Sequence, residues 1–175
     1  GTLMHAIIED FYNRPEYTQQ YIMDKLTSTR PVPKEIEYFC QYENDRLNHI
    51  LFNNHEHLRP YRTEWTVFDE ELLIAGSIDM IYESTKTGHL VIVDWKRCRE
   101  IKKHNAWEYG KVEALEHVPH TNYWHYAIQL NLYRYILQRR YERVVDELWL
   151  VCMHPDNANQ SYLRYQVPIM ENEIE

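Results

Sequence analysis

The sequence predicts an α/β or α+β layered fold in which helices flank a central mixed sheet. Candidate helices occupy the first third of the 175-residue chain. A hairpin of two apolar, β-rich runs follows over residues 72–96. A long amphipathic helix over 122–140 then separates that hairpin from two further candidate strands. Helices that precede and interrupt a run of strands are typical of a layered fold with one core, so we expect a single domain over 1–175.

The N-terminal part is predicted to be helical. A first helix runs from Thr2 to about Tyr12, because apolar residues recur on one face. Residues 16–26 form a weaker helical candidate. A third helix is expected from Pro33, whose fixed backbone angle suits a first helical turn, and its apolar spacing extends to His57. Pro60 is expected to end this region.

The remainder alternates strands with one strong helix. Strands are predicted over 61–68, 72–83 and 89–96, followed after the helix by strands over 144–153 and 162–167. The segment 97–120 is charged and aromatic and has no clear periodicity, so a loop with a short helix is expected there. The chain opens inside the first predicted helix, as a domain taken from a larger protein would.

Composition restricts the possible functions. The net charge of −8 argues against nucleic-acid binding by bulk positive charge, but it is compatible with an acidic metal site beside local basic strips. The three cysteines, Cys40, Cys98 and Cys152, are scattered and form no CxxC pair, which favours a reducing, intracellular compartment. The sequence contains no run of 18 apolar residues and no visible signal peptide, so no contact with a membrane is expected.

The hairpin carries the strongest candidate site. Asp79 interrupts its first apolar run and Asp94 its second, and Lys96 lies two residues beyond Asp94. Residues i and i+2 of a strand share a face, so Asp94 and Lys96 project together, away from Val93 and Trp95. Two carboxylates and an amine on one face suit a divalent cation and the water it activates. A structural ion pair between Asp94 and Lys96 is the alternative, with Asp79 as a hydrogen-bonded core carboxylate.

Two helices add weaker candidates. His5 lies near the apolar face of the first helix with Glu9 one turn further on; either a metal ligand or an ordinary packed histidine fits that position. Gln129 and Tyr133 are spaced i, i+4 and therefore share one helix face. In one interpretation they contact a site carboxylate or a phosphate. In the other, Tyr133 belongs to the core and Gln129 is the polar residue at its edge. Glu64, on the predicted strand over 61–68, fits either a further acidic member of the site or, as we favour, an exposed strand position.

Taken in order, these residues resemble the PD-(D/E)XK nuclease superfamily, and within it the RecB-like branch. The resemblance rests on a first-helix histidine in GTLMH, an aspartate in GSIDMIY, the D-x-K triplet in VDWK and the Q-x-x-x-Y motif in QLNLY. It covers about residues 1–168. It implies a restriction-endonuclease-like core with the order αβββαβ.

The resemblance also implies roles for these residues. His5, Asp79 and Asp94, together with the backbone carbonyl of Trp95, would bind Mg²⁺ or Mn²⁺. Lys96 would position or activate the attacking water, with Gln129 and Tyr133 completing the catalytic set. Members of the branch that hold an iron–sulfur cluster need four cysteines, so no such cluster is expected in a chain with three.

The implied substrate is nucleic acid, with DNA favoured over RNA. Phosphate contacts are expected from basic residues near the site, and base stacking from an aromatic one: Arg97, Arg99, Lys103, Arg134 and Trp124. The expected activity is that of a DNA exonuclease or end-processing nuclease in repair or recombination, working with a helicase or polymerase domain or subunit. An endonuclease acting on RNA or DNA and a catalytically silent nucleic-acid-binding module are the two alternatives.

Overall fold

The computed structural model describes residues 2–14, 33–48, 51, 58–99, 101 and 122–171. Its centre is a sheet in the order β1 (Leu58–Asp69), β2 (Ile74–Ser84), β3 (Leu90–Lys96), β4 (Val145–Cys152) and β5 (Leu163–Val167). All neighbouring strands are antiparallel except β3 and β4. The sheet is therefore mixed, as the sequence predicts.

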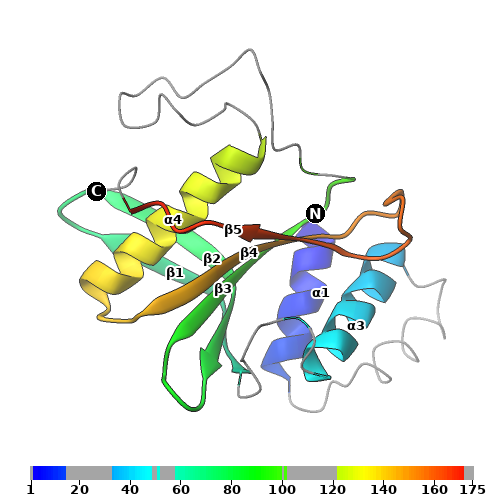
Figure 1. Ribbon diagram of the computed structural model, residues 1–175, viewed down its shortest axis with the longest axis horizontal. Coiled ribbons are helices and arrows are strands. Elements are labelled where there is room, and N and C mark those ends of the chain that lie inside the picture. Colours follow the sequence, from blue (N-terminus) through cyan, green and yellow to red (C-terminus); the bar gives the residue numbers. More distant parts are fainter. Residues whose placement is uncertain are drawn as a thin grey trace.

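Helices cover both faces of this sheet (Figure 1). Helix α4 (Asn122–Arg140) lies on one face, and α1 (Thr2–Asn13) and α3 (Lys34–Leu47) lie on the other. The chain segment between β3 and β4 contains α4, which is the usual kind of connection between parallel neighbours. This three-layer arrangement confirms the α+β fold.

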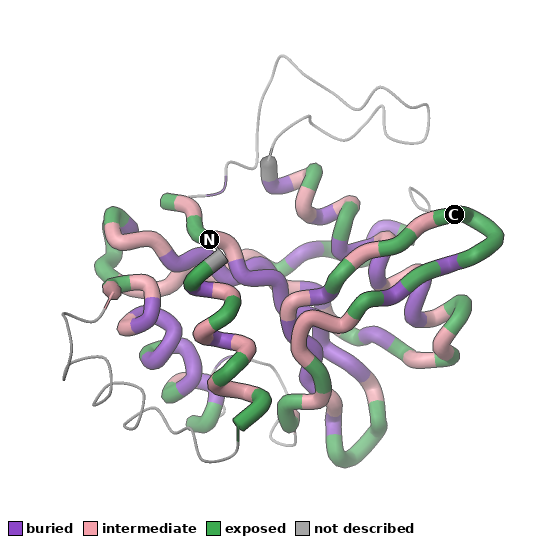
Figure 2. The backbone as a smooth tube through the Cα atoms, turned by 180° about the vertical axis from the view of Figure 1, so that it is seen from behind, coloured by how far each residue is buried: buried purple, intermediate pink, exposed green. Residues whose placement is uncertain are grey.

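Strand β3 lies at the middle of the sheet and is buried along almost its whole length (Figure 2). Its side chains alternate between two cores: Ile92 packs with α4, whereas Val93 and Trp95 pack with α1 and α3. A strand covered on both faces is expected to be almost continuously apolar, as LVIVDWK is up to Asp94. That one carboxylate is the exception that requires an explanation.

A buried polar network joins the layers on the α1 and α3 side. The Tyr12 hydroxyl donates to Glu43 at 2.5 Å and lies 2.7 Å from the Tyr82 hydroxyl. Arg46 Nε donates to Glu43 at 2.9 Å, and a second guanidinium nitrogen contacts the other carboxylate oxygen. Burial and the Glu43 charge raise the pKa of Tyr12, so its hydroxyl stays protonated and donates. The pair of Glu43 and Arg46 thus supplies fixed charge inside a core.

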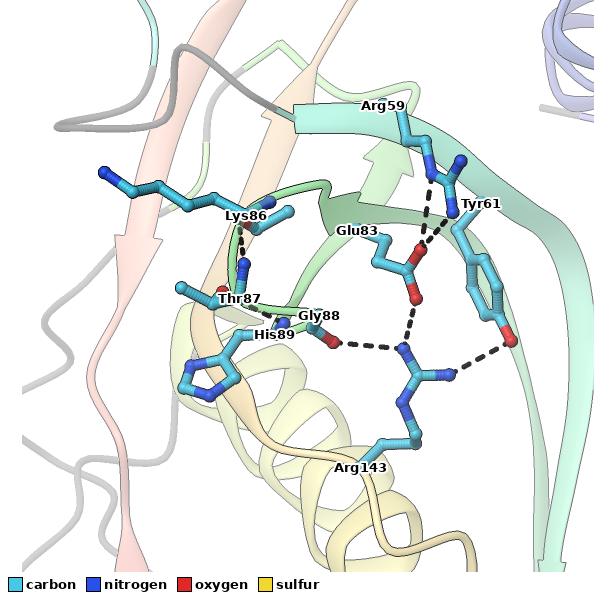
Figure 3. A network of polar contacts seen from close by, with 9 residues as sticks. Arg59, Tyr61, Glu83, Lys86, Thr87, Gly88, His89 and Arg143 are labelled. Carbon is cyan, nitrogen blue, oxygen red and sulfur yellow. Dashed lines mark hydrogen bonds and ion pairs between the residues drawn. The ribbon is translucent and has the colours of Figure 1, made fainter.

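A second network closes the turn of the β2–β3 hairpin (Figure 3). Arg143 donates to the Tyr61 hydroxyl at 3.0 Å, to Glu83 at 2.5 Å and to the Gly88 carbonyl at 3.1 Å. Arg59 reaches the other oxygen of Glu83 at 2.7 Å. These contacts tie the start of β4 to β1 and β2 and leave the opposite end of β3 as the place for a site.

Most predicted elements are confirmed, and two boundaries are wrong. The helix expected to reach His57 ends at Leu47, where Asn48 leaves the helical path after donating to the Asn44 carbonyl. Pro60 does not end a helix but lies inside β1, next to a register shift between Pro60 and Arg62. An edge strand tolerates proline at such an irregularity, because the missing N–H has no ladder partner to lose. The predicted helix over 16–26 and the flap within 97–120 fall almost entirely outside the described residues.

Among the described residues, no helix is long and apolar enough to cross a membrane.

Replacing Arg46 with Met is expected to lower the free energy of unfolding by about 3 kcal/mol or more, because it leaves the Glu43 carboxylate buried without its cation. Urea unfolding at pH 7 measures this. Arg59→Met is the matched control, since Arg59 is 62% exposed in its pair with Glu83, and such pairs contribute about 1 kcal/mol at most. Equal losses in the two variants would contradict the network.

Candidate active site

The candidate site begins where the pairing of β2 with β3 ends. The last pair of that ladder is Met80 with Val93, whereas β3 continues beside β4 as far as Lys96. Beyond Val93, the Trp95 N–H therefore has no partner on the β2 backbone. The Asp79 side chain takes that role and accepts the Trp95 N–H at 2.9 Å. The splayed strands thus fix one carboxylate at an opening in the sheet.

His5 brings a nitrogen from α1 to the same point. Its Nε2 lies 2.9 Å from the Trp95 carbonyl oxygen and 3.2 Å from Asp79 Oδ2. Adjacent ligands around an octahedral ion with bonds near 2.1 Å are separated by about 3 Å. An imidazole nitrogen thus lies at hydrogen-bond distance from a carbonyl oxygen and beside a carboxylate oxygen, and these two spacings are also those of neighbouring ligands on a divalent cation.

Asp94 supplies a buried carboxylate beside this group. The residue is 5% exposed, and its Oδ2 lies 2.8 Å from Lys96 Nζ without the alignment of a hydrogen bond. Within the described part of the chain, that oxygen has no hydrogen-bond partner. Burial and the nearby Asp79 charge raise the pKa of Asp94 to about 7. The pKa of Asp94 is raised although an ammonium lies at 2.8 Å, so a divalent cation beside this carboxylate would further offset the free-energy cost of burying its charge.

The described side chains do not themselves form a closed metal cage. No group of three His, Cys, Asp or Glu side chains is close enough to hold an ion within the described ranges. The converging set has two side chains and one backbone carbonyl, with Asp94 next to it. This is a partial shell, of the kind that leaves positions for water and a substrate oxygen on a hard cation such as Mg²⁺.

Lys96 completes the arrangement as a charged donor. Its Nζ lies 4.2 Å from the centre of the Tyr126 ring, in addition to its ion pair with Asp94. Burial alone would lower the pKa of Lys96, but the Asp94 carboxylate outweighs it and the pKa rises. The ammonium is therefore charged at neutral pH and acts by orientation and charge stabilisation, not as a base.

One face of α4 lies beside these residues. Tyr126, Gln129 and Tyr133 follow one another at spacings of three and four, and Tyr133 is 7% exposed while Gln129 is exposed. Burial and the charges of Asp94 and Asp79 raise the pKa of Tyr133, which a hydrogen bond with Gln129 partly offsets. Tyr133 therefore lies near the two carboxylates, and Gln129 is bonded to it from the exposed side of the helix. The Q-x-x-x-Y motif does not include Tyr126, although its spacing of three from Gln129 puts it on the same helix face.

Gly76 allows the Tyr133 ring to reach this position. A Cβ added at Gly76 would lie 2.3 Å from Cε1 of Tyr133, closer than carbon atoms approach. The glycine is thus required for close packing of helix on strand at the site and not for a turn.

Glu64 is nearer to the site than an exposed strand residue would be. The register that pairs Thr63 with Met80 and Trp65 with Ile78 sets Glu64 opposite Asp79. Its φ is +45°, uncommon for glutamate, and its carboxylate accepts from the Ser77 hydroxyl at 3.3 Å. Burial and Asp79 raise its pKa.

The predicted substrate contacts are not all brought to this point. Arg97 and Arg99 are exposed just beyond Lys96, with Arg97 paired to Glu35 at 3.2 Å. Arg134 instead donates to the Val145 carbonyl and to Glu171, which makes it a structural link. Trp124 packs edge-on against Tyr123. Lys103 lies outside the described residues.

Two hollows lie elsewhere on the surface. One of about 360 Å³ lies at the β1–β2 turn against the end of α4, remote from the carboxylates, and is lined by Phe68, Glu70, Glu71, Arg140 and Tyr141. A smaller one of about 220 Å³ is adjacent to the site and includes Met4, Glu35 and Arg97. None of the site residues His5, Asp79 and Asp94 lines the larger hollow. We therefore locate the candidate site by these side chains and not by the hollow.

Comparison with known proteins identifies the family and the fold of the chain. The family description "PD-(D/E)XK nuclease superfamily" matches residues 1–173. The chain belongs to this superfamily. Its fold is also similar to the crystal structure of a "Putative exonuclease" from Eubacterium rectale, with a TM-score of 0.52 and 14% identity. The match covers 99% of this chain and 60% of that one, and at this identity it shows the fold alone. No curated protein is recognisably similar.

The superfamily and the fold predicted from the sequence are therefore confirmed. Members of this superfamily are nucleases, so the family implies hydrolytic chemistry on nucleic acid. PD-(D/E)XK nucleases generally use divalent metal ions, which agrees with the donor set formed by His5, Asp79 and Trp95.

The raised pKa of Asp94 predicts a pH dependence of stability in metal-free protein. Its pKa is about 7 when folded against 3.8 as the reference, so the folded state binds more protons between these values. The free energy of unfolding should therefore fall as pH rises from 4 to 7, by at most about 4 kcal/mol from this group. Unfolding in urea with EDTA, for wild type and Asp94→Asn, isolates the contribution. Parallel pH curves for the two proteins would contradict it.

Gly76→Ala is expected to displace the Tyr133 ring and to cost about 1–3 kcal/mol of unfolding free energy. In a Tyr133→Ala background the same change should cost far less, because the clashing ring is gone. Thermal unfolding of the four proteins gives the coupling. An equal cost in both backgrounds would show that the ring is not what Gly76 accommodates.

Proposed function

We propose that this chain is a divalent-metal-dependent DNA nuclease of the RecB-like branch that acts from strand ends. The observation that carries the proposal is the convergence of His5 Nε2, Asp79 Oδ2 and the Trp95 carbonyl beside the Asp94–Lys96 pair. Family membership supports the hydrolytic chemistry, and the donor set supports the metal dependence.

The proposed division of roles follows from the contacts. His5, Asp79, Asp94 and the Trp95 carbonyl hold Mg²⁺ or Mn²⁺, and the imidazole favours Mn²⁺ in vitro. A bound ion would supply a Lewis acid. Lys96, kept charged by Asp94, would orient the attacking water and stabilise charge on the phosphate.

Helix α4 supplies the second half of the proposed site. Gln129 is exposed and able to meet a phosphate or a ligand carboxylate, and Tyr133 packs beneath it. Arg97 and Arg99 are exposed and follow Lys96 directly at the end of β3, which suits contacts to phosphate. We retain Lys103, Trp124 and Arg134 as weaker substrate candidates.

End-dependent action on DNA is favoured over two other functions. The Gln129–Tyr133 face suits the RecB-like branch, and the structural neighbour is named "Putative exonuclease". An endonuclease acting on RNA or DNA would need the same metal and lysine. A silent binding module is disfavoured because Asp79, Asp94 and Lys96 are all present and close together. Since the chain spans 60% of the neighbour, further domains such as a helicase or polymerase remain part of the proposal.

The test is cleavage of end-labelled linear and circular DNA, single- and double-stranded, and of RNA, with Mg²⁺, Mn²⁺ or EDTA. We expect loss of linear DNA only with metal, intact circles, and at least a hundredfold lower rate for Lys96→Ala, since losing one transition-state charge contact costs about that much. Lys86→Ala, in the hairpin turn, is the matched control and should cleave normally (Figure 3).

Cleavage of circular DNA, or faster cleavage of RNA than of DNA, would contradict end-dependent action on DNA and favour an endonuclease. Undiminished cleavage by Lys96→Ala would remove the role assigned to that residue. Metal binding shown by calorimetry without any cleavage would favour the binding module.

A further inference from the structure

Two cysteines that are far apart in the sequence meet beside Lys96. Cys98 Sγ lies 3.2 Å from Cys152 Sγ, although 54 residues separate them along the chain. Cys152 is the register partner of Lys96 on β4, and Cys98 follows Lys96 by two residues. The sequence suggested scattered thiols and no pairing. The structure places two of the three in contact at the edge of the candidate site.

The two sulfur atoms have only a short distance to move before they could be joined. The bond length of a disulfide is about 2.05 Å, so the two atoms must approach by about 1 Å. Strand β3 is fixed against β4 up to this point, because the Met153 N–H donates to the Lys96 carbonyl at 2.8 Å. The adjustment therefore falls on Arg97 and Cys98, which lie just beyond the strand.

The two thiols differ in ways that suit an ordered exchange reaction. Cys98 is partly exposed, whereas Cys152 is fully buried. A hydrogen bond from Cys152 and the charge of Lys96 lower the pKa of the Cys98 thiol. The same contact with Cys98, together with burial, raises the pKa of the Cys152 thiol. Cys98 is thus the accessible nucleophile and Cys152 the resolving thiol.

We propose that Cys98 and Cys152 form a thiol modification site that is oxidised reversibly to a disulfide by low-molecular-weight disulfides. The Cys98 thiolate attacks one sulfur of oxidised glutathione, and the first glutathione leaves as its thiolate. Cys152 then attacks Cys98 Sγ and displaces the second. The protein loses two thiol hydrogens, and the glutathione disulfide is reduced to two thiols that take up the two protons.

The cross-link joins the segment that follows β3 to strand β4, and it closes a long loop that contains α4. Closing a loop of this length restricts the unfolded chain, so the oxidised protein should melt higher by roughly 5–10 °C. Because β3 is already anchored to β4 at Lys96, the native fold should be retained.

The experiment treats the native protein with oxidised glutathione and counts thiols. Three free thiols should fall to one, the intact mass should fall by two hydrogens, and peptide mapping should show Cys98 joined to Cys152. Dithiothreitol should restore all three thiols. Cys40→Ser is the matched control, because Cys40 lies in the core on the α1 and α3 side, and it should still form the disulfide with its thiol count falling from two to zero.

Three results would overturn the proposal: no loss of thiols, a disulfide that includes Cys40, or a glutathione adduct that stays on Cys98. Cys98→Ser, at a partly exposed position, should show no rise in melting temperature on oxidation. A rise equal to that of wild type would show that the Cys98–Cys152 disulfide is not the source of the stabilisation. None of these measurements depends on cleavage, so the dithiol is tested whether or not the proposed nuclease activity is found.

Discussion

The Asp94 carboxylate on a buried strand is the constraint on which the candidate site depends. A carboxylate that is 5% exposed in a strand covered on both faces is costly unless a cation neutralises it. Lys96 meets part of that cost from the same strand face, at 2.8 Å from Asp94 Oδ2. The charge of Asp79, together with burial, keeps the Asp94 pKa near 7, so the pair is not fully satisfied. The raised pKa of Asp94 and its proposed role beside a cation thus have one origin, the burial of a carboxylate next to a second one.

The remaining features follow from where β2 leaves β3. Ending that ladder at Met80 and Val93 frees the Trp95 N–H for Asp79 and lets the Trp95 carbonyl face His5. Meanwhile the Trp95 side chain is 1% exposed in the core with α1 and α3, which holds the backbone in place. One residue therefore serves two layers: its indole anchors the strand, and its peptide groups organise the donors.

The sequence predicted well what depends on periodicity and local order. Helix α4 matches its predicted bounds, and the i, i+2 rule correctly put Asp94 and Lys96 on one face. It was wrong at the end of α3, where Asn48 leaves the helical path although the apolar spacing continues. The position of Pro60 within an edge strand and the contact of Arg134 with the Val145 carbonyl depend on neighbours that are distant in sequence. The roles of the individual site residues stay predictions.

The contact of Cys98 with Cys152 is a second feature that could not be predicted from the sequence. Sequence spacing alone gave no reason to pair these thiols, because the parallel register of β3 and β4 is created by the crossover through α4. That register also sets Cys152 beside Lys96. A parallel neighbour of the D-x-K strand can therefore add chemistry to the site edge that no motif in either strand encodes. Residues of β4 that pair with β3 are consequently where functional differences between such domains should be sought.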